Sequence, residues 1–287
     1  MIDATLILEG GGLRGVYTSG VLRALADHGI FFSRIIAVSM GACNASNYIA
    51  GQFERNRRVN IEWLSDPRYL SWVRWLSGGE LFGMDFLFGD LPLRLDPFAM
   101  DAFLASPVRF HMVATDCHTG EAVYREKSAL GRAGSLSFMR ASCSLPFAAP
   151  PVPFEGRLLM DGGMADSIPL EWSLAQGHDR HLAVLTRPAG YRKRPTKWAL
   201  AARRIYRRLP GIARRLGDRH IRYNRALDRL AEEDAAGRAV VIRPGADLLI
   251  SRTGRNHRML YKAYDRGWRD AETMLPVIER RLAGGDG

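Results

Sequence analysis

The sequence predicts an α/β protein: a three-layer α/β/α sandwich with a mainly parallel central sheet, followed by a mainly helical C-terminal extension. Two observations predict this fold class. Short apolar runs alternate with segments whose apolar residues recur at helical spacing, and the texture becomes Arg-rich and helix-like after residue 186. Strands that alternate with helices are typical of a sheet covered by helices on both faces.

The first half of the chain supplies the expected strands in order. Residues 5–8 predict a short buried strand, and residues 16–28 predict a helix that stops at Gly29. Residues 35–38 predict a second buried strand, with a helix over 42–53. Residues 110–114 and 121–124 predict two strands joined by a turn at 116–120. Residues 181–186 and 239–242 are further short apolar runs.

The chain divides near residue 186 into a first domain over 1–186 and a basic extension over 187–287. We expect this extension to be mainly helical and packed on or beside the first domain. Residues 187–229 contain 15 Lys and Arg against two acidic residues, so this segment accounts for the net charge of +11. Within it, Arg203, Arg204, Arg207 and Arg208 lie largely off the apolar face of a predicted helix.

Composition excludes several classes of protein. The chain is 47% hydrophobic and 25% charged, which is typical of a folded globular protein. No apolar run approaches the ~20 residues of a membrane span, and the N-terminus lacks the pattern of a secretory signal. Three cysteines without metal-ligand spacing indicate a reduced, cytoplasmic setting and no metal site.

The first motif is "LEGGGLRG" at residues 8–15, which lies between a predicted strand and a predicted helix. Such a loop presents free N–H groups where negative charge is favoured. Gly10, Gly12 and Gly15 also fit the dinucleotide pattern G-x-G-x-x-G, which requires an acidic residue at the end of the next strand. That strand ends at Ser39 instead, and Asp27 lies in the preceding helix. A nucleotide-binding protein using Gly10–Gly15 is therefore the weaker alternative, beside a plain glycine turn.

The second motif is Ala37-Val38-Ser39-Met40-Gly41, between a predicted strand and helix. A nucleophile elbow is written G-x-S-x-G because the sharp corner needs small neighbours on both sides of the serine. Alanine replaces the first glycine here and adds only a methyl group. A serine at this position can also be a simple helix cap, but the flanking strand and helix favour a nucleophile.

Two more motifs follow. In "LLMDGGMADSIP", residues 158–169, Asp161 ends an apolar stretch and precedes Gly162 and Gly163, which permit unusual backbone angles. Asp-Gly-Gly is by itself a frequent turn. The run "ASCSLPF", residues 141–147, consists of small residues closed by a proline.

These four motifs, in this order, resemble the patatin-like phospholipase family over roughly residues 5–186. The family's G-G-G-x-R-G loop corresponds to residues 10–15, its serine elbow to 37–41, its A-S-x-S/A-x-P stretch to 141–146 and its D-G-G/A to 161–163. Ala37 is the one clear departure. The stretches "DPRYLSWVRW" (66–75) and "GMDFLFGDLP" (83–92), together with the tail, also resemble a bacterial subgroup with a basic helical C-terminal extension.

The resemblance implies a serine lipid acyl hydrolase of the phospholipase A or carboxylesterase type, without a cofactor. Ser39 would be the nucleophile and Asp161 the base, in a dyad without histidine. The N–H groups near Gly11, Gly12 and Leu13 would bind the oxyanion. The supporting motif residues would be Gly10, Arg14, Gly15, Met40, Gly41, Gly162 and Gly163.

A Ser-His-Asp esterase remains an alternative, since any of the seven histidines could be brought to Ser39 by the fold. No histidine carries a motif of its own. A carboxylate base would be helped by burial, which raises its pKa.

The substrate side is less specific. The aromatic-rich stretch 61–88 predicts either core packing or a flap over an acyl groove. The basic segment 187–229 predicts either a solvated face or peripheral contact with anionic lipid at the inner face of the membrane. No nucleic-acid partner is expected, because no binding module accompanies the charge. The expected substrate is a lipid or phospholipid ester.

Overall fold

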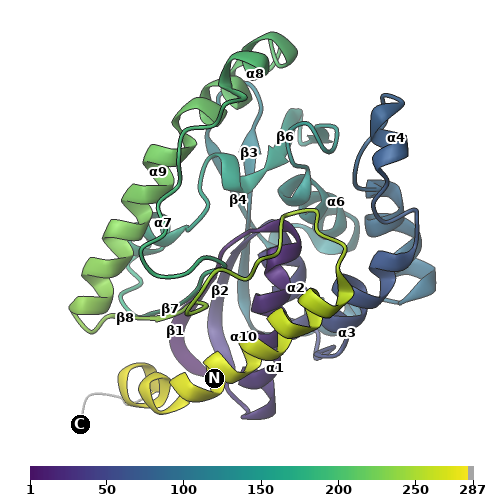
Figure 1. The fold of residues 1–287 in the computed structure, drawn as a ribbon. Helices are drawn as coiled ribbons and strands as arrows, with labels where there is room; N and C mark the ends of the chain where they lie inside the picture. Colours follow the sequence, from purple (N-terminus) through teal and green to yellow (C-terminus); the bar gives the residue numbers. More distant parts are fainter. Residues whose placement is uncertain (284–287) are drawn as a thin grey trace.

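The computed structural model describes residues 1–283 and contains one mixed, mostly parallel sheet between two layers of helices (Figure 1). The strands are β1 (Ile2–Leu8), β2 (Phe32–Val38), β3 (Arg109–Asp116), β4 (Ala122–Glu126), β5 (Val152–Phe154), β6 (Arg157–Asp161), β7 (His181–Val184) and β8 (Ala239–Ile242). The α-helices are α1 (Val16–Asp27), α2 (Met40–Ile49), α3 (Arg55–Arg57), α4 (Trp72–Leu76), α5 (Met100–Ala105), α6 (Gly131–Cys143), α7 (Leu170–Ala175), α8 (Ala199–Ile205), α9 (Pro210–Ala235) and α10 (His257–Ile278).

The sheet has the order β5-β6-β3-β2-β1-β7-β8, with β4 also paired to β3. β3, β2, β1, β7 and β8 are parallel, whereas β4, β5 and β6 pair antiparallel at one end. The predicted α/β sandwich is thus confirmed. β1 and β2 end side by side, with Leu8 opposite Ala37, so the loops that follow them meet at one edge.

Alternation along β1 shows how the sheet joins the two helical layers. Leu6 and Leu8 are fully buried in the core beneath α1, α2 and α10, whereas Ile7 faces the opposite core with Leu170 of α7 and Leu230 of α9. In Figure 1 the green α9 and the yellow α10 accordingly lie on different sides of the sheet. Each strand thereby contributes to both cores.

The segment after residue 186 supplies parts to every layer. β8 extends the parallel sheet beside β7, α9 covers one face, and α10 packs along α1 on the other. The run 239–242 is a strand as predicted. The division of the chain near residue 186 stays a prediction.

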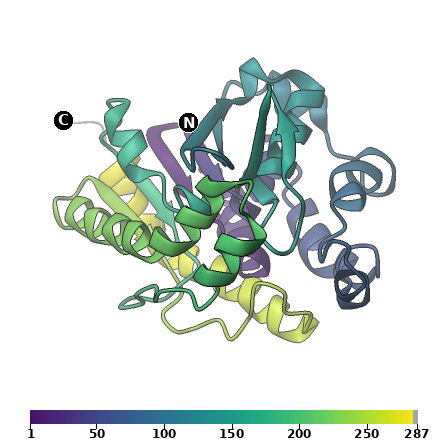
Figure 2. The ribbon, with the colours of Figure 1, turned by 90° about the horizontal axis from the view of Figure 1, so that it is seen from above.

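Residues 50–100 form a separate side of the molecule, shown in blue (Figure 2). This region contains a π-helical stretch at Phe86–Leu95 and the short exposed helix α4. None of the helices within residues 1–283 combines the length and the apolarity that a membrane span requires.

Candidate active site

Ser39 lies at the corner between β2 and α2, where the sequence predicts an elbow. Its backbone has φ 55° and ψ −129°, a conformation that costs free energy for a residue with a side chain. The side chain does not cap α2, so the helix-cap interpretation is wrong. The residue is buried, and Ala37 fits within β2 without preventing the turn.

Ser142 of α6 holds this strained corner in place. Its hydroxyl donates to the carbonyl of Val113 at 2.6 Å and accepts the backbone N–H of Ser39 at 2.9 Å. Both bonds are buried, where a lost partner is expensive. The run "ASCSLPF" therefore contributes the residue that anchors the elbow, a role that the sequence alone did not assign.

Asp161 ends β6 and is almost completely buried. Its Oδ1 accepts the N–H of Gly163 at 2.8 Å. Its backbone N–H donates to the carbonyl of Ser144, and its carbonyl accepts the hydroxyl of Thr115. The end of α6 thus fixes both Ser39, through Ser142, and Asp161, through Ser144.

Burial raises the pKa of Asp161, while the charge of Arg219 and the hydroxyl of Ser39 lower it in part. Ser39 is thus close enough to affect the pKa of this carboxyl, but no hydrogen bond of standard geometry joins the two side chains. Among residues 1–283, Oδ2 of Asp161 nevertheless has no hydrogen-bond partner of standard geometry. One carboxylate oxygen thus accepts the N–H of Gly163, and the other has no hydrogen-bond partner among the described residues.

The glycine loop runs directly over the elbow. A β-carbon at Gly10 would lie 2.9 Å from Cβ of Ser39, so a larger residue cannot occupy this position. Gly12 has φ 56°, which favours glycine. The N–H of Leu13 donates to the carbonyl of Arg252 at 3.1 Å. The N–H of Leu13, one of the three predicted oxyanion donors, is therefore engaged, whereas those of Gly11 and Gly12 form no backbone hydrogen bond among residues 1–283.

The remaining motif residues pack around this centre. Gly15 lies against Met40, and a β-carbon at Gly41 would approach the carbonyl of Leu8 to 2.8 Å. A β-carbon at Gly162 would similarly contact β3. Arg14 is buried, and its Nε has no partner among the described residues.

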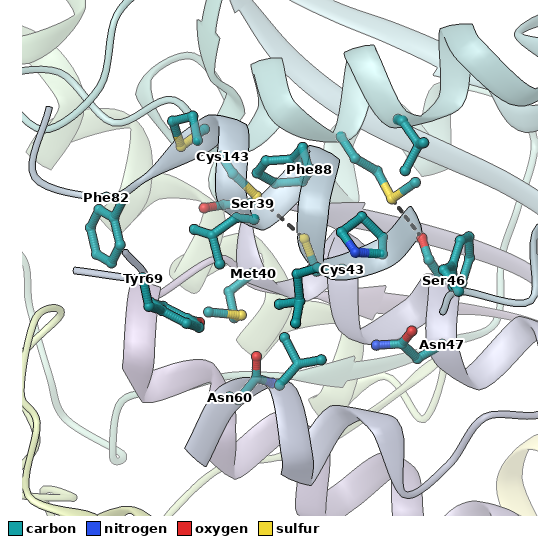
Figure 3. A pocket seen from close by; sticks show the side chains of 18 of the residues that line it. Ser39, Met40, Cys43, Ser46, Asn47, Asn60, Tyr69, Phe82, Phe88 and Cys143 are labelled. Atoms are coloured by element: carbon teal, nitrogen blue, oxygen red, sulfur yellow. Dashed lines mark hydrogen bonds between the residues drawn. The ribbon is translucent and has the colours of Figure 1, made fainter. Parts of the chain in front are cut away.

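An apolar pocket opens beside Ser39 (Figure 3). Its walls come from α2, the π-helical stretch and α6, and they include Met40, Leu87, Phe88, Leu91, Leu136 and Met139.

Two thiols line the same pocket: Sγ of Cys43 and Sγ of Cys143 lie 3.5 Å apart. The aromatic stretch 61–88 is divided, because Tyr69 and Phe82 line the pocket whereas Trp72 and Trp75 of α4 are exposed. Core and surface roles are therefore both present in this stretch.

Histidine does not contribute to this centre within the described part of the chain. No histidine lines the pocket, and none forms a hydrogen bond with Ser39 or Asp161. His181, the most buried, bonds to the hydroxyl of Ser173 at 2.9 Å. No group of three or more His, Cys, Asp or Glu side chains in residues 1–283 gathers as metal ligands would.

Comparison with known proteins identifies the family. A sequence model described as patatin-like phospholipase matches residues 6–172. The chain belongs to the patatin-like phospholipase family. A second model, Domain of unknown function (DUF6363), matches residues 209–283.

Among curated relatives of this patatin-like chain, the uncharacterized protein YjjU of Escherichia coli (strain K12) is 30% identical over 194 residues, covering 64% of this chain and 52% of that protein. Lysophospholipase NTE1 of Eremothecium gossypii is 27% identical over 190 residues, covering 62% and 12% respectively. The chain thus spans about half the length of YjjU and a smaller share of NTE1. VipD from Legionella pneumophila shares the fold, with a TM-score of 0.59 at 12% identity over 98% of this chain and 67% of that one.

Proposed function

We propose that this patatin-like chain is a serine lipid acyl hydrolase that uses Ser39 as nucleophile and Asp161 as general base. The observation that carries the proposal is a strained elbow serine beside a buried carboxyl of raised pKa, at the mouth of an apolar pocket. A carboxylate is ordinarily a weak base, and its raised pKa makes it a better proton acceptor.

The reaction follows from this arrangement. Asp161 takes the hydroxyl proton as Ser39 Oγ attacks the ester carbonyl, and the N–H groups of Gly11 and Gly12 stabilise the oxyanion. Collapse of the intermediate breaks the bond to the alcohol, which leaves with the proton held by Asp161. Water, deprotonated by Asp161, then attacks the acyl group on Ser39. The bond to Ser39 Oγ breaks, Asp161 returns the proton to Oγ, and the fatty acid is released.

The pocket supports a long acyl chain as the substituent on the carbonyl. Ser46 lines it seven residues beyond Ser39, which at the rise of an α-helix is about 10 Å. Its walls are largely apolar, so burial of methylene groups would drive binding. Lipid or phospholipid esters are therefore the proposed substrate class.

Hydrolysis of p-nitrophenyl esters tests the proposal. Ser39→Ala and Asp161→Asn should each lower kcat/KM by about 10³-fold or more. Two matched controls should retain activity. Ser33→Ala changes a half-buried serine on β2, the strand that precedes Ser39, and Asp166→Asn changes a buried carboxyl whose pKa is also raised but which accepts the hydroxyl of Tyr124. Full activity in Asp161→Asn would instead indicate a histidine base.

Peripheral contact with anionic membrane is proposed for the surface formed by α8 and α4. Trp198, Leu200 and Ile205 are 65%, 78% and 60% exposed, beside the four arginines at 203, 204, 207 and 208. Phe147 connects the two helices, because its ring lies 6.2 Å from that of Trp198 and its carbonyl accepts the indole N–H of Trp75.

Exposed tryptophan next to arginine is typical of surfaces that bind anionic lipid. Changing the four arginines to glutamine should weaken binding to phosphatidylglycerol vesicles and reduce its dependence on salt. Unchanged sedimentation with these vesicles would show that the arginines are only solvated.

A further inference from the structure

Three cationic side chains from the segment after residue 186 converge beside the proposed dyad. A β-carbon at Gly163 would lie 3.0 Å from both Nη2 of Arg219 and Oδ1 of Asp161, so the Arg219 guanidinium reaches the carboxyl's surroundings from α9. Arg252 reaches the glycine loop, where a β-carbon at Gly12 would lie 3.1 Å from its Cβ.

Lys193 completes the group from the loop before α8. Its Nζ lies 4.0 Å from the ring centroid of Tyr223, and the hydroxyl of Tyr223 donates to Glu9 at 2.8 Å. Glu9 directly precedes the glycine loop. Arg252 thus lies at the glycine loop and Arg219 beside Asp161, and the charges of both act on Lys193.

Among the described residues, no direct ion pair neutralises these charges. Within residues 1–283, the side chains of Lys193, Arg219 and Arg252 form no ion pair, and Nε of Arg219 is buried without a hydrogen-bond partner. Glu9 is already occupied, because Thr186 donates to Oε2 through both its N–H and its hydroxyl, and Tyr223 donates to Oε1.

This lack of ion pairs within the described residues is reflected in the titration of the group. Burial, with the charges of Arg219 and Arg252, lowers the pKa of Lys193 to about 6. Burial and Arg252 lower the pKa of Arg219 to about 10. The charged form of each side chain is therefore held at a cost that a bound anion would relieve, and a bound anion would favour the charged form of Lys193.

Balancing Asp161 does not account for the whole group. One guanidinium, that of Arg219, is enough to oppose one carboxylate. Lys193 and Arg252 add positive charge where Glu9 is the only further acid among their nearest charged neighbours. An excess of partly buried cations around a site is typical of anion binding.

The position of the group relative to Ser39 indicates what the anion belongs to. Gly12 borders both regions, since it lines the apolar pocket and contacts Arg252, but none of the three cations lines that pocket. Each of the three residues keeps part of its surface exposed, although Nε of Arg219 is buried. An ester bound at Ser39 with its acyl chain in the pocket would leave its alcohol portion free to extend toward the cations.

We propose that Lys193, Arg219 and Arg252 form a subsite for the phosphate of the substrate's headgroup, which makes the substrate a phosphate-bearing lipid ester and not a neutral glyceride. This inference rests on the proposed function. It assigns to the C-terminal extension a direct part in substrate selection, beside an acyl pocket whose walls come from residues 12–145.

The test compares two short-chain substrates that are monomeric in solution: a lysophosphatidylglycerol and the monoacylglycerol with the same acyl chain. The wild-type protein should favour the phosphate-bearing ester in kcat/KM. Lys193→Met and Arg252→Met should each reduce this preference about tenfold or more, the size expected for a lost charge-assisted hydrogen bond. The control Arg258→Met removes an exposed cation of α10 and should keep the preference.

A second measurement distinguishes a headgroup subsite from a site for free phosphate. Inorganic phosphate should raise the Tm of the wild-type protein, and less so that of Lys193→Met. Stabilisation by phosphate without any preference between the two esters would overturn the headgroup assignment. Equal hydrolysis of both esters overturns this inference alone, whereas hydrolysis of neither ester overturns the proposed function together with it.

Discussion

Gly267→Ala should destabilise the protein, because α1 and α10 are in backbone contact at Gly20 and Gly267. A β-carbon at Gly267 would lie 2.0 Å from the carbonyl oxygen of Tyr17, and one at Gly20 would lie 2.0 Å from that of Tyr264. Real β-carbons essentially never approach closer than 3.0 Å, so the helices must separate by about 1 Å.

The magnitude follows from two opposing effects. Overpacking of this kind costs about 1–3 kcal/mol. Replacing a helical glycine returns about 0.5–1 kcal/mol. The net loss of about 1–2 kcal/mol corresponds to a fall in Tm of roughly 2–8 °C for a chain of this size.

The matched control is Gly217→Ala in α9, where a β-carbon would meet no atom within 4 Å. This change should leave the Tm unchanged or raise it slightly. Thermal unfolding followed by circular dichroism, with the urea midpoint as a second measure, separates the two variants. If Gly267→Ala were as stable as Gly217→Ala, the close contact between α1 and α10 would be refuted.

Three further changes test the site. Ser142→Ala should lower the free energy of unfolding in urea by about 1–3 kcal/mol and reduce kcat, since it leaves the N–H of Ser39 unpaired. The control is Ser144→Ala, because the Ser144 hydroxyl donates only to the carbonyl of Arg140 in α6. An equal effect of the two changes would argue against this role of Ser142. Met139→Trp should lower the ratio of kcat/KM for the dodecanoyl ester to kcat/KM for the acetyl p-nitrophenyl ester by about tenfold, because a bulkier side chain fills the pocket. An unchanged ratio would place the acyl chain elsewhere. Because folding raises the pKa of Asp161, its protonated form stabilises the folded protein. This stability is fully present below the pKa that Asp161 has in the unfolded chain, and it is lost as pH rises through the pKa in the folded protein. Asp161→Asn should therefore raise the Tm at pH 7 but not near pH 4, and a pH-independent change would contradict this.

The sequence predicted the parallel part of the sheet because its strands are short apolar runs with clear ends. The runs at 5–8, 35–38 and 239–242 lie in β1, β2 and β8. It did not predict α6, whose sequence is rich in glycine and serine. That helix is stabilised by tertiary packing of Phe138 and Met139 and not by local propensity.

The motifs single out the candidate site residues but not the side chains that surround them. Ser39, the glycine loop and Asp161 belong to recognisable patterns. Arg219 and Arg252 do not, since they come from a helix and a loop with no pattern of their own. Their proximity to the glycine loop depends on how α9 and α10 fold back over the sheet, which local spacing does not encode.

The packing of α10 against α1 also has a consequence for biosynthesis. The hydroxyl of Tyr17 bonds to Asp270, 253 positions later, at 2.9 Å. A nascent chain thus exposes the surface of α1 that contacts α10 until residues 257–278 have been translated. A contact between such distant parts of the sequence slows folding, and the apolar surface exposed in the meantime favours aggregation. Cells that make this protein should therefore depend on chaperones that shield α1 until translation has supplied its partner.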